Sequence, residues 1–217
     1  MEEKRNFDLL TLGQVLLRLS PPNNDRLVRG DTFVKQVGGA ELNVAVGVAL
    51  LGLRTGVISK LPSHDMGSFM KGKIRSYGVS DDFFMYDDSP SARVGIYYYE
   101  NGAYPRKPKV IYDRANSSFY SLKIDEIPEK AYTASRCFHT SGITLALSPK
   151  VRETTIEMIK RFKAAGTLVS FDVNFRGNLW TGEEAKECIE QILPYVDIFF
   201  CSEDTARLTF KKTGTAR

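Results

Sequence analysis

Helix-start signals alternate with strand-like runs through the C-terminal third of this 217-residue chain. Ser148 followed by Pro149 is typical of an N-cap with proline at the first helical position, and that helix would end at Gly166. Thr181 and Glu184 have the spacing of a capping box. Strands that alternate with helices of about ten to sixteen residues predict parallel βαβ units, and therefore a mostly parallel sheet flanked by helices.

Strand signals are denser in the N-terminal half. The runs at residues 92–100 and 109–113 are rich in β-branched and aromatic residues, and the turn sequence NGAYPRKP between them predicts a hairpin. Residues 40–51 are apolar nearly all round, which predicts a buried helix. We expect an α/β fold with a doubly wound core and a small extra sheet from about residues 14–36 and 92–114.

Charge, hydropathy and cysteine patterns exclude several classes of function. The net charge is +4 with both signs mixed along the chain, so there is no basic block of the kind that binds nucleic acid. No window approaches about 18 uninterrupted apolar residues, so no membrane span is predicted. The three cysteines lie far apart without zinc or disulfide spacing, which indicates free thiols in a reducing, cytoplasmic compartment. With two histidines, no metal-ligand set is predicted.

The stretch QVGGAELNVAVGVALLG places Gly38 and Gly39 directly before the apolar helix. Glycines let the backbone approach a ligand closely, and the start of a helix offers unpaired N–H groups. Asn43 lies about one turn into the helix and can both donate and accept hydrogen bonds, which suits a polyol. The alternative is that the glycines only make a tight turn and that Asn43 caps locally.

Two further stretches carry arginine where a strand ends. In VIYDRANSS, Tyr112 and Arg114 lie two apart and share one strand face, and arginine binds a carboxylate with two parallel hydrogen bonds. In SFDVNFRGNLW, Asp172, Asn174 and Arg176 offer hydrogen-bonding groups for phosphates or hydroxyls at the carboxyl end of a strand, where ligands of open parallel sheets bind. The alternatives are an ordinary surface arginine in the first stretch and a structural Asp172–Arg176 pair in the second.

Nucleotide-binding signatures of two common kinds do not occur. The chain has no P-loop sequence and no G-x-G-x-x-G after the first strand. Ser202, which follows the strand-like run DIFFC, is first of all a helix cap.

Taken in order, these pieces resemble the PfkB/ribokinase family of carbohydrate kinases. GGAELNVAVGVALLG is similar to the family's Gly-Gly-x-x-x-Asn motif, and YDR, HTSGITLALSP and FDVNFRGNLW are similar to its sugar-acid branch. The resemblance implies a ribokinase-like doubly wound α/β fold, of which residues 1–217 are the N-terminal part, with a small β-sheet lid. It also implies phosphorylation of a sugar or sugar acid at a terminal hydroxyl with ATP and Mg²⁺, with 2-keto-3-deoxygluconate as the first candidate substrate.

The resemblance further implies roles for individual residues. Tyr112 and Arg114 would pair with the carboxylate of the sugar, and Arg176 would stabilise the transition state between sugar and phosphates. Asn174, Arg176 and Ser202 would lie near the nucleotide, and a homodimer through the lid sheets is expected. The residues expected to bind the sugar are Leu16, Gly38, Gly39, Asn43, Tyr97, Tyr112, Arg114, Ile143 and Arg176.

The sequence departs from the family pattern at three places. The family's G-A-G-D loop, with its anion hole and catalytic aspartate, does not occur, so the base is expected beyond Arg217 and the chain alone is expected to be inactive. Ser202 and Thr205 stand where Asn-x-x-Glu is usual, and Gln14 stands where sugar-acid kinases often carry glutamate. The alternative functions are a 5-dehydro-2-deoxygluconate kinase, a fructokinase, or a non-catalytic sugar-binding module.

Overall fold

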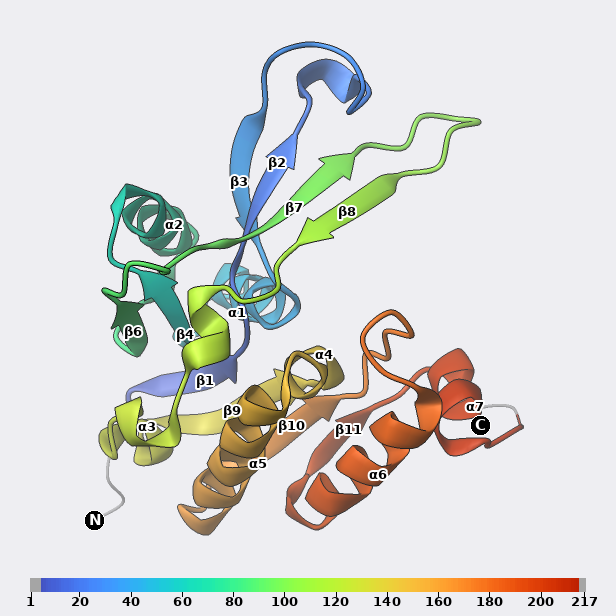
Figure 1. Ribbon diagram of the computed structural model, residues 1–217. Helices are drawn as coiled ribbons and strands as arrows, with labels where there is room; N and C mark the ends of the chain where they lie inside the picture. The colour runs from blue at the N-terminus through green and yellow to red at the C-terminus, as the bar shows by residue number, and fades with distance from the viewer. Residues whose placement is uncertain (1–4, 215–217) are drawn as a thin grey trace.

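The computed structural model describes residues 5–214, which form two sheets (Figure 1). The larger sheet is parallel and seven-stranded, in the order β11-β10-β9-β1-β4-β5, and β6 also pairs with β4. Its strands are β1 (Phe7–Leu12), β4 (Thr55–Pro62), β5 (Val79–Ser80), β6 (Phe84–Asp87), β9 (Ser135–Ser141), β10 (Leu168–Asp172) and β11 (Ile198–Phe200). The predicted mostly parallel sheet is confirmed.

A second sheet projects from the larger one (top of Figure 1), and we call it the lid. Its four strands lie in the order β3-β2-β7-β8. They are β2 (Leu16–Ser20), β3 (Val34–Gly38), β7 (Gly95–Glu100) and β8 (Lys109–Asp113). Arg18 lies between Gln36 and Tyr97 in the register, and Tyr97 lies beside Tyr112. Because side chains alternate between the faces of a sheet, these four residues form one row on a single face of the lid.

Helices cover the larger sheet from both sides. Alternation along β4 shows this, because Ile58 packs in a cluster with Phe162 of α5 whereas Val57 packs with Leu42 of α1 and Met70 of α2. Among residues 5–214, no helix has the length and hydropathy needed to cross a bilayer. The helices are α1 (Ala40–Leu50), α2 (Asp65–Ser76), α3 (Lys130–Thr133), α4 (Gly142–Ala146), α5 (Pro149–Ala164), α6 (Gly182–Ile192) and α7 (Glu203–Phe210), with 3₁₀ turns at η1 (Pro22–Asn24), η2 (Ser118–Ser121), η3 (Ile124–Glu126) and η4 (Leu193–Tyr195).

The predicted caps start the C-terminal helices. The Ser148 hydroxyl accepts from the Val151 amide at 3.2 Å at the start of α5. The capping box of α6 is complete, because Thr181 accepts from the Glu184 amide at 3.2 Å and the Glu184 carboxylate accepts from the Thr181 amide at 2.7 Å. Ser202 caps α7 in the same way. These caps satisfy amides that otherwise have no intrahelical partner.

The prediction of a buried helix at residues 40–51 is wrong in one respect. α1 forms where expected, but only Glu41, Leu42 and Ala45 are buried within it, and Leu50 is 80% exposed. The helix packs chiefly against β1 and β4, and Val44 and Leu50 on it are exposed. Because α1 is apolar on nearly every side, part of its apolar surface is exposed to solvent.

Candidate functional site

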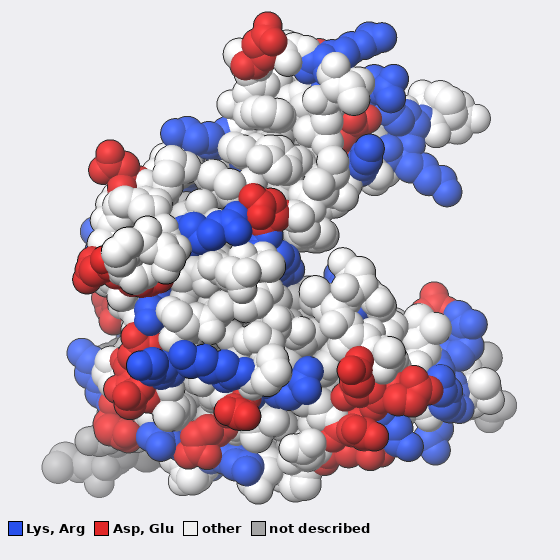
Figure 2. Space-filling model, in the orientation of Figure 1, with Lys and Arg blue, Asp and Glu red and all other residues white. Residues whose placement is uncertain are grey.

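A cavity of about 280 Å³ lies between the lid and the carboxyl edge of the larger sheet, in the hollow visible in Figure 2. This is where ligands of open α/β sheets bind. Eight of the residues predicted to bind the sugar line it. They are Leu16, Gly39, Asn43, Tyr97, Tyr112, Arg114, Ile143 and Arg176.

The paired glycines are explained by close packing. A Cβ at Gly38 would lie 2.5 Å from the Tyr97 hydroxyl, and one at Gly39, whose φ is 155°, would lie 2.7 Å from the Gln14 carbonyl oxygen. Close packing therefore accounts for glycine at both positions, and Gly39 also lines the cavity. Asn43 differs, because its exposed side chain has no hydrogen-bond partner in the described part of the chain and lines the cavity.

Arg114 is placed by the segment that leaves β8. Its Nε donates to the Gln14 Oε1 at 2.7 Å, and its guanidinium lies 5.6 Å from the centre of the Tyr112 ring. Tyr112 and Arg114 therefore share one side of the lid, as their spacing predicted. Burial lowers the pKa of the Arg114 guanidinium, but arginine remains charged at neutral pH.

Tyr97 and Tyr112 of the lid line the cavity and can offer it their hydroxyl groups. The Tyr97 and Tyr112 rings lie 6.0 Å apart, and Tyr97 is half-buried. Burial raises the pKa of Tyr97, so its hydroxyl stays protonated and can donate a hydrogen bond. Beside them, Arg18 lies 4.3 Å from the centre of the Tyr99 ring, and its Nε donates to Ser20 at 2.9 Å.

Glu41 supplies the carboxylate that lines the cavity, and sequence reasoning missed it. Its Oε1 accepts from the hydroxyls of Ser141 at 2.6 Å and Thr144 at 2.8 Å, at the start of α4. Burial raises the pKa of Glu41. The carboxyl thus ties the first turn of α1 to the helix that carries Ile143. The hydroxyls one residue before and two residues after Gly142 in TSGIT were the available signal.

Arg176 reaches the cavity from the loop after β10. No carboxylate within the described residues forms an ion pair with it, since Asp172 instead accepts from the Asn174 amide at 3.0 Å. The structural Asp172–Arg176 alternative is therefore not found. Asn174, in a left-handed conformation with φ of 35°, and Ser202, which caps α7, lie outside this cavity.

Comparison with known proteins identifies the family of this chain. Residues 6–217 match the family model described as pfkB family carbohydrate kinase. A 2-dehydro-3-deoxygalactonokinase of Haloferax volcanii is 37% identical over 209 residues, which are 96% of this chain and 65% of that protein. A 5-dehydro-2-deoxygluconokinase of Shouchella clausii is 30% identical, over 84% of this chain and 56% of that protein.

A solved structure of a related kinase has the same fold. The crystal structure of 2-dehydro-3-deoxygluconokinase from Thermotoga maritima superposes with a TM-score of 0.90 at 35% identity, over 95% of this chain and 63% of that one. This chain thus spans less than two thirds of the length of these relatives. The larger parallel sheet, the lid and the family match lead to one conclusion: the chain belongs to the pfkB family of carbohydrate kinases, with a ribokinase-like fold.

Proposed function

We propose that the whole protein uses ATP to phosphorylate a sugar acid, 2-keto-3-deoxygluconate (2-dehydro-3-deoxygluconate) or its galacto epimer, at a terminal hydroxyl. One observation carries this proposal. Arg114 lines the cavity beside two tyrosines, and no carboxylate among residues 5–214 pairs with its guanidinium, which leaves a planar cation for a ligand carboxylate. The names of the relatives, which include a gluconokinase and a galactonokinase, support the substrate class.

The roles proposed around the sugar follow from the chemistry of the lining groups. Asn43 and Tyr97 would bind hydroxyls, Ile143 would pack against the carbon chain, and Arg176 would stabilise negative charge on the transferred phosphoryl group. ATP supplies that phosphoryl group when bound, and its phosphates would meet Arg176, whose guanidinium has no carboxylate partner among the described residues.

Residues 5–214 hold no metal cage, and the residues that line the cavity include no acidic side chain without hydrogen-bond partners. Residues 5–214 contain no group of three or more His, Cys, Asp or Glu that could hold a metal, so we propose that Mg²⁺ is held mainly by nucleotide phosphates. Glu41 is occupied by Ser141 and Thr144, and it is the acidic residue that lines the cavity. We therefore keep the expectation, implied by the resemblance, that the base lies outside these 217 residues.

An open apolar face supports the idea that the whole enzyme contains more chain. Leu168 on β10, and Ile198 and Phe200 on the edge strand β11, are 51%, 41% and 54% exposed. Beside them is a cavity of about 330 Å³ that Val44 and Val48 of α1 also line. Apolar surface of this extent is normally covered, and the matched relatives are longer than this chain.

Two further expectations remain proposals. Exposed apolar side chains on the lid, Phe33, Val34 and Ile111, support a homodimer formed through the lid sheets. The three cysteines are free thiols, which supports a reducing, cytoplasmic location. A 5-dehydro-2-deoxygluconate kinase, a fructokinase and a non-catalytic sugar-binding module are the competing functions.

A thermal-shift panel tests the proposal. A ligand at about 100 times its dissociation constant should stabilise the fold by about 2.7 kcal/mol. We expect 2-keto-3-deoxygluconate or its galacto epimer to raise the melting temperature, and fructose and 5-dehydro-2-deoxygluconate to raise it less. Stabilisation by fructose alone would favour the fructokinase, and no response to any sugar or sugar acid would contradict the assigned site.

A further inference from the structure

Gln14 lies two residues after the end of β1, and both ends of its side-chain amide are hydrogen-bonded inside the protein. It is 3% exposed. Its Oε1 accepts from the Arg114 Nε at 2.7 Å, and its Nε2 donates to the Ser117 hydroxyl at 2.6 Å and to the Arg114 carbonyl oxygen at 3.2 Å. Because the guanidinium can only donate and the carbonyl can only accept, the two ends of the amide cannot be exchanged.

A glycine makes room for this amide. A Cβ at Gly95, on β7, would lie 2.8 Å from the Gln14 Nε2, 2.6 Å from the Leu16 Cδ2 and 3.4 Å from the Arg114 Cβ. Cβ atoms essentially never approach other atoms this closely, so a side chain at residue 95 would displace Gln14 or Leu16.

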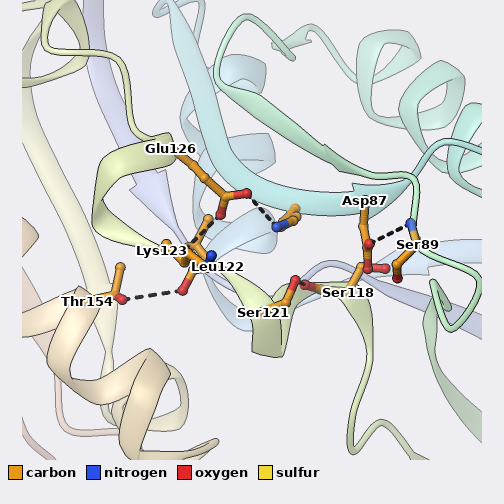
Figure 3. Close-up of polar contacts among 9 residues, drawn as sticks. Asp87, Ser89, Ser118, Ser121, Leu122, Lys123, Glu126 and Thr154 are labelled. Carbon is orange, nitrogen blue, oxygen red and sulfur yellow. Dashed lines mark hydrogen bonds and ion pairs between the residues drawn. The ribbon is translucent and has the colours of Figure 1, made fainter.

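The segment that carries Ser117 is itself fastened to the main body. Figure 3 shows the polar contacts that follow it, in which the Glu126 carboxylate joins the Lys60 amine at 2.6 Å and Thr154 donates to the Leu122 carbonyl at 3.4 Å. Ser118 is also bound to Arg93, through its amide at 2.9 Å and its hydroxyl at 3.2 Å. Gln14 therefore holds Arg114 against a fixed part of the molecule.

This arrangement leaves one edge of the guanidinium for a ligand. The Arg114 Nε donates its hydrogen bond to Gln14. The two terminal nitrogens of the guanidinium have no hydrogen-bond partner among residues 5–214. We infer that Gln14 is a positioning residue that sets the specificity for acids, because it orients Arg114 so that these two nitrogens meet the ligand carboxylate as a fork. The inference rests on the proposed function, since it concerns how that site reads its substrate.

Three variants at residue 14 and at a control position test this role. Gln14→Met keeps the size of the side chain but cannot accept from the guanidinium, whereas Gln14→Glu still accepts from it but adds a carboxylate that pairs with Arg114. Gln191→Met is the matched control, because Gln191 is exposed on α6 far from the cavity. Calorimetric titration with 2-keto-3-deoxygluconate should show a loss of about tenfold in Gln14→Met, or about 1.4 kcal/mol, and a value within about threefold of wild type in Gln191→Met.

Fructose separates positioning from general damage to the fold. Its affinity should change little in Gln14→Met, because a neutral ketose does not need the fork. Equal losses for both ligands, or wild-type acid affinity in Gln14→Met, would each overturn the inference. Failure of wild type to bind the acid would instead overturn the proposed function.

A measurement without ligand tests the role of Gln14 even if the proposed function is wrong. The Arg114 Nε–H resonance in ¹⁵N NMR should exchange slowly with solvent in wild type and Gln14→Glu, and quickly in Gln14→Met. Gly95→Ala should behave like Gln14→Met, since the added Cβ displaces the amide. Slow exchange that persists in both Gln14→Met and Gly95→Ala would overturn the role of Gln14 even if the chain binds no sugar.

Discussion

Three arginines and one glutamate carry the charge of the cavity. Arg18, Arg114 and Arg176 all line it, and Glu41 is the acidic residue that lines it with them. The Glu41 carboxylate is already bound by two hydroxyls, so the cavity presents a positive surface to its ligand. A site of one sign of charge raises the local concentration of an oppositely charged substrate, which fits an acid better than a neutral sugar.

The buried carboxyl of Glu41 should affect stability in a pH-dependent way. Its folded pKa is raised above the ordinary value of 4.5, so the favourable contribution of its protonated form is lost as pH rises through the folded pKa. Glu41→Gln imitates the neutral form and should melt at a higher temperature than wild type at about pH 7, with the difference shrinking towards about pH 4.5. Glu190→Gln, an exposed change on α6, should show no such trend. A difference in melting temperature that grows as pH falls would contradict this assignment.

At the scale of elements, the caps are the part of the structure that local sequence determines. Thr181→Ala removes the acceptor for the Glu184 amide and should cost about 1 kcal/mol of unfolding free energy. Chemical denaturation measures this value. Thr32→Ala, at an exposed position outside any helix or strand, is the control and should stay within about 0.5 kcal/mol of wild type. Equal effects of the two changes would show that the cap does not stabilise α6.

Sequence patterns predicted the long elements well because their signals are local. The capped helices and the hairpin of β7 and β8 fall within a few residues of the predicted bounds. Short elements such as β5, β6 and α4 carry too few residues for a periodic signal.

Which residues line the cavity depends on contacts between segments that are distant in the sequence, and no local pattern reports those contacts. Arg18 joins the cavity because β2 pairs with β7, which is far away in the chain. Glu41 was hidden within an apolar helix, and its role depends on hydroxyls from α4. Gly95 had no local signal, because its constraint comes from Gln14 and Leu16 on other segments. Motif resemblance brought in Leu16, Tyr97 and Ile143, whose roles stay predictions, and no sequence pattern pointed to Tyr99 or Val110.

For the whole molecule, the position of the acidic groups bears on activity. Asp172 ends β10 and accepts from the Asn174 amide at 3.0 Å, and it does not line the cavity. We expect the purified 217-residue chain to show no sugar kinase activity above background in an assay of ADP release. Turnover that Asp172→Asn abolishes would show that the base lies within this chain, contrary to the proposal.

Carboxylate recognition by Arg114 is the central claim, and calorimetric titration of wild type and two variants tests it most directly. A charge-assisted hydrogen bond contributes about 1.5–3 kcal/mol, so Arg114→Ala should weaken binding of 2-keto-3-deoxygluconate by about ten- to a hundredfold. Arg114→Lys should recover little, because a point charge cannot reproduce the two-pronged guanidinium, and fructose should be nearly indifferent to both changes. Wild-type affinity for the acid in Arg114→Ala, or fructose bound by wild type as tightly as the acid, would contradict the sugar-acid assignment.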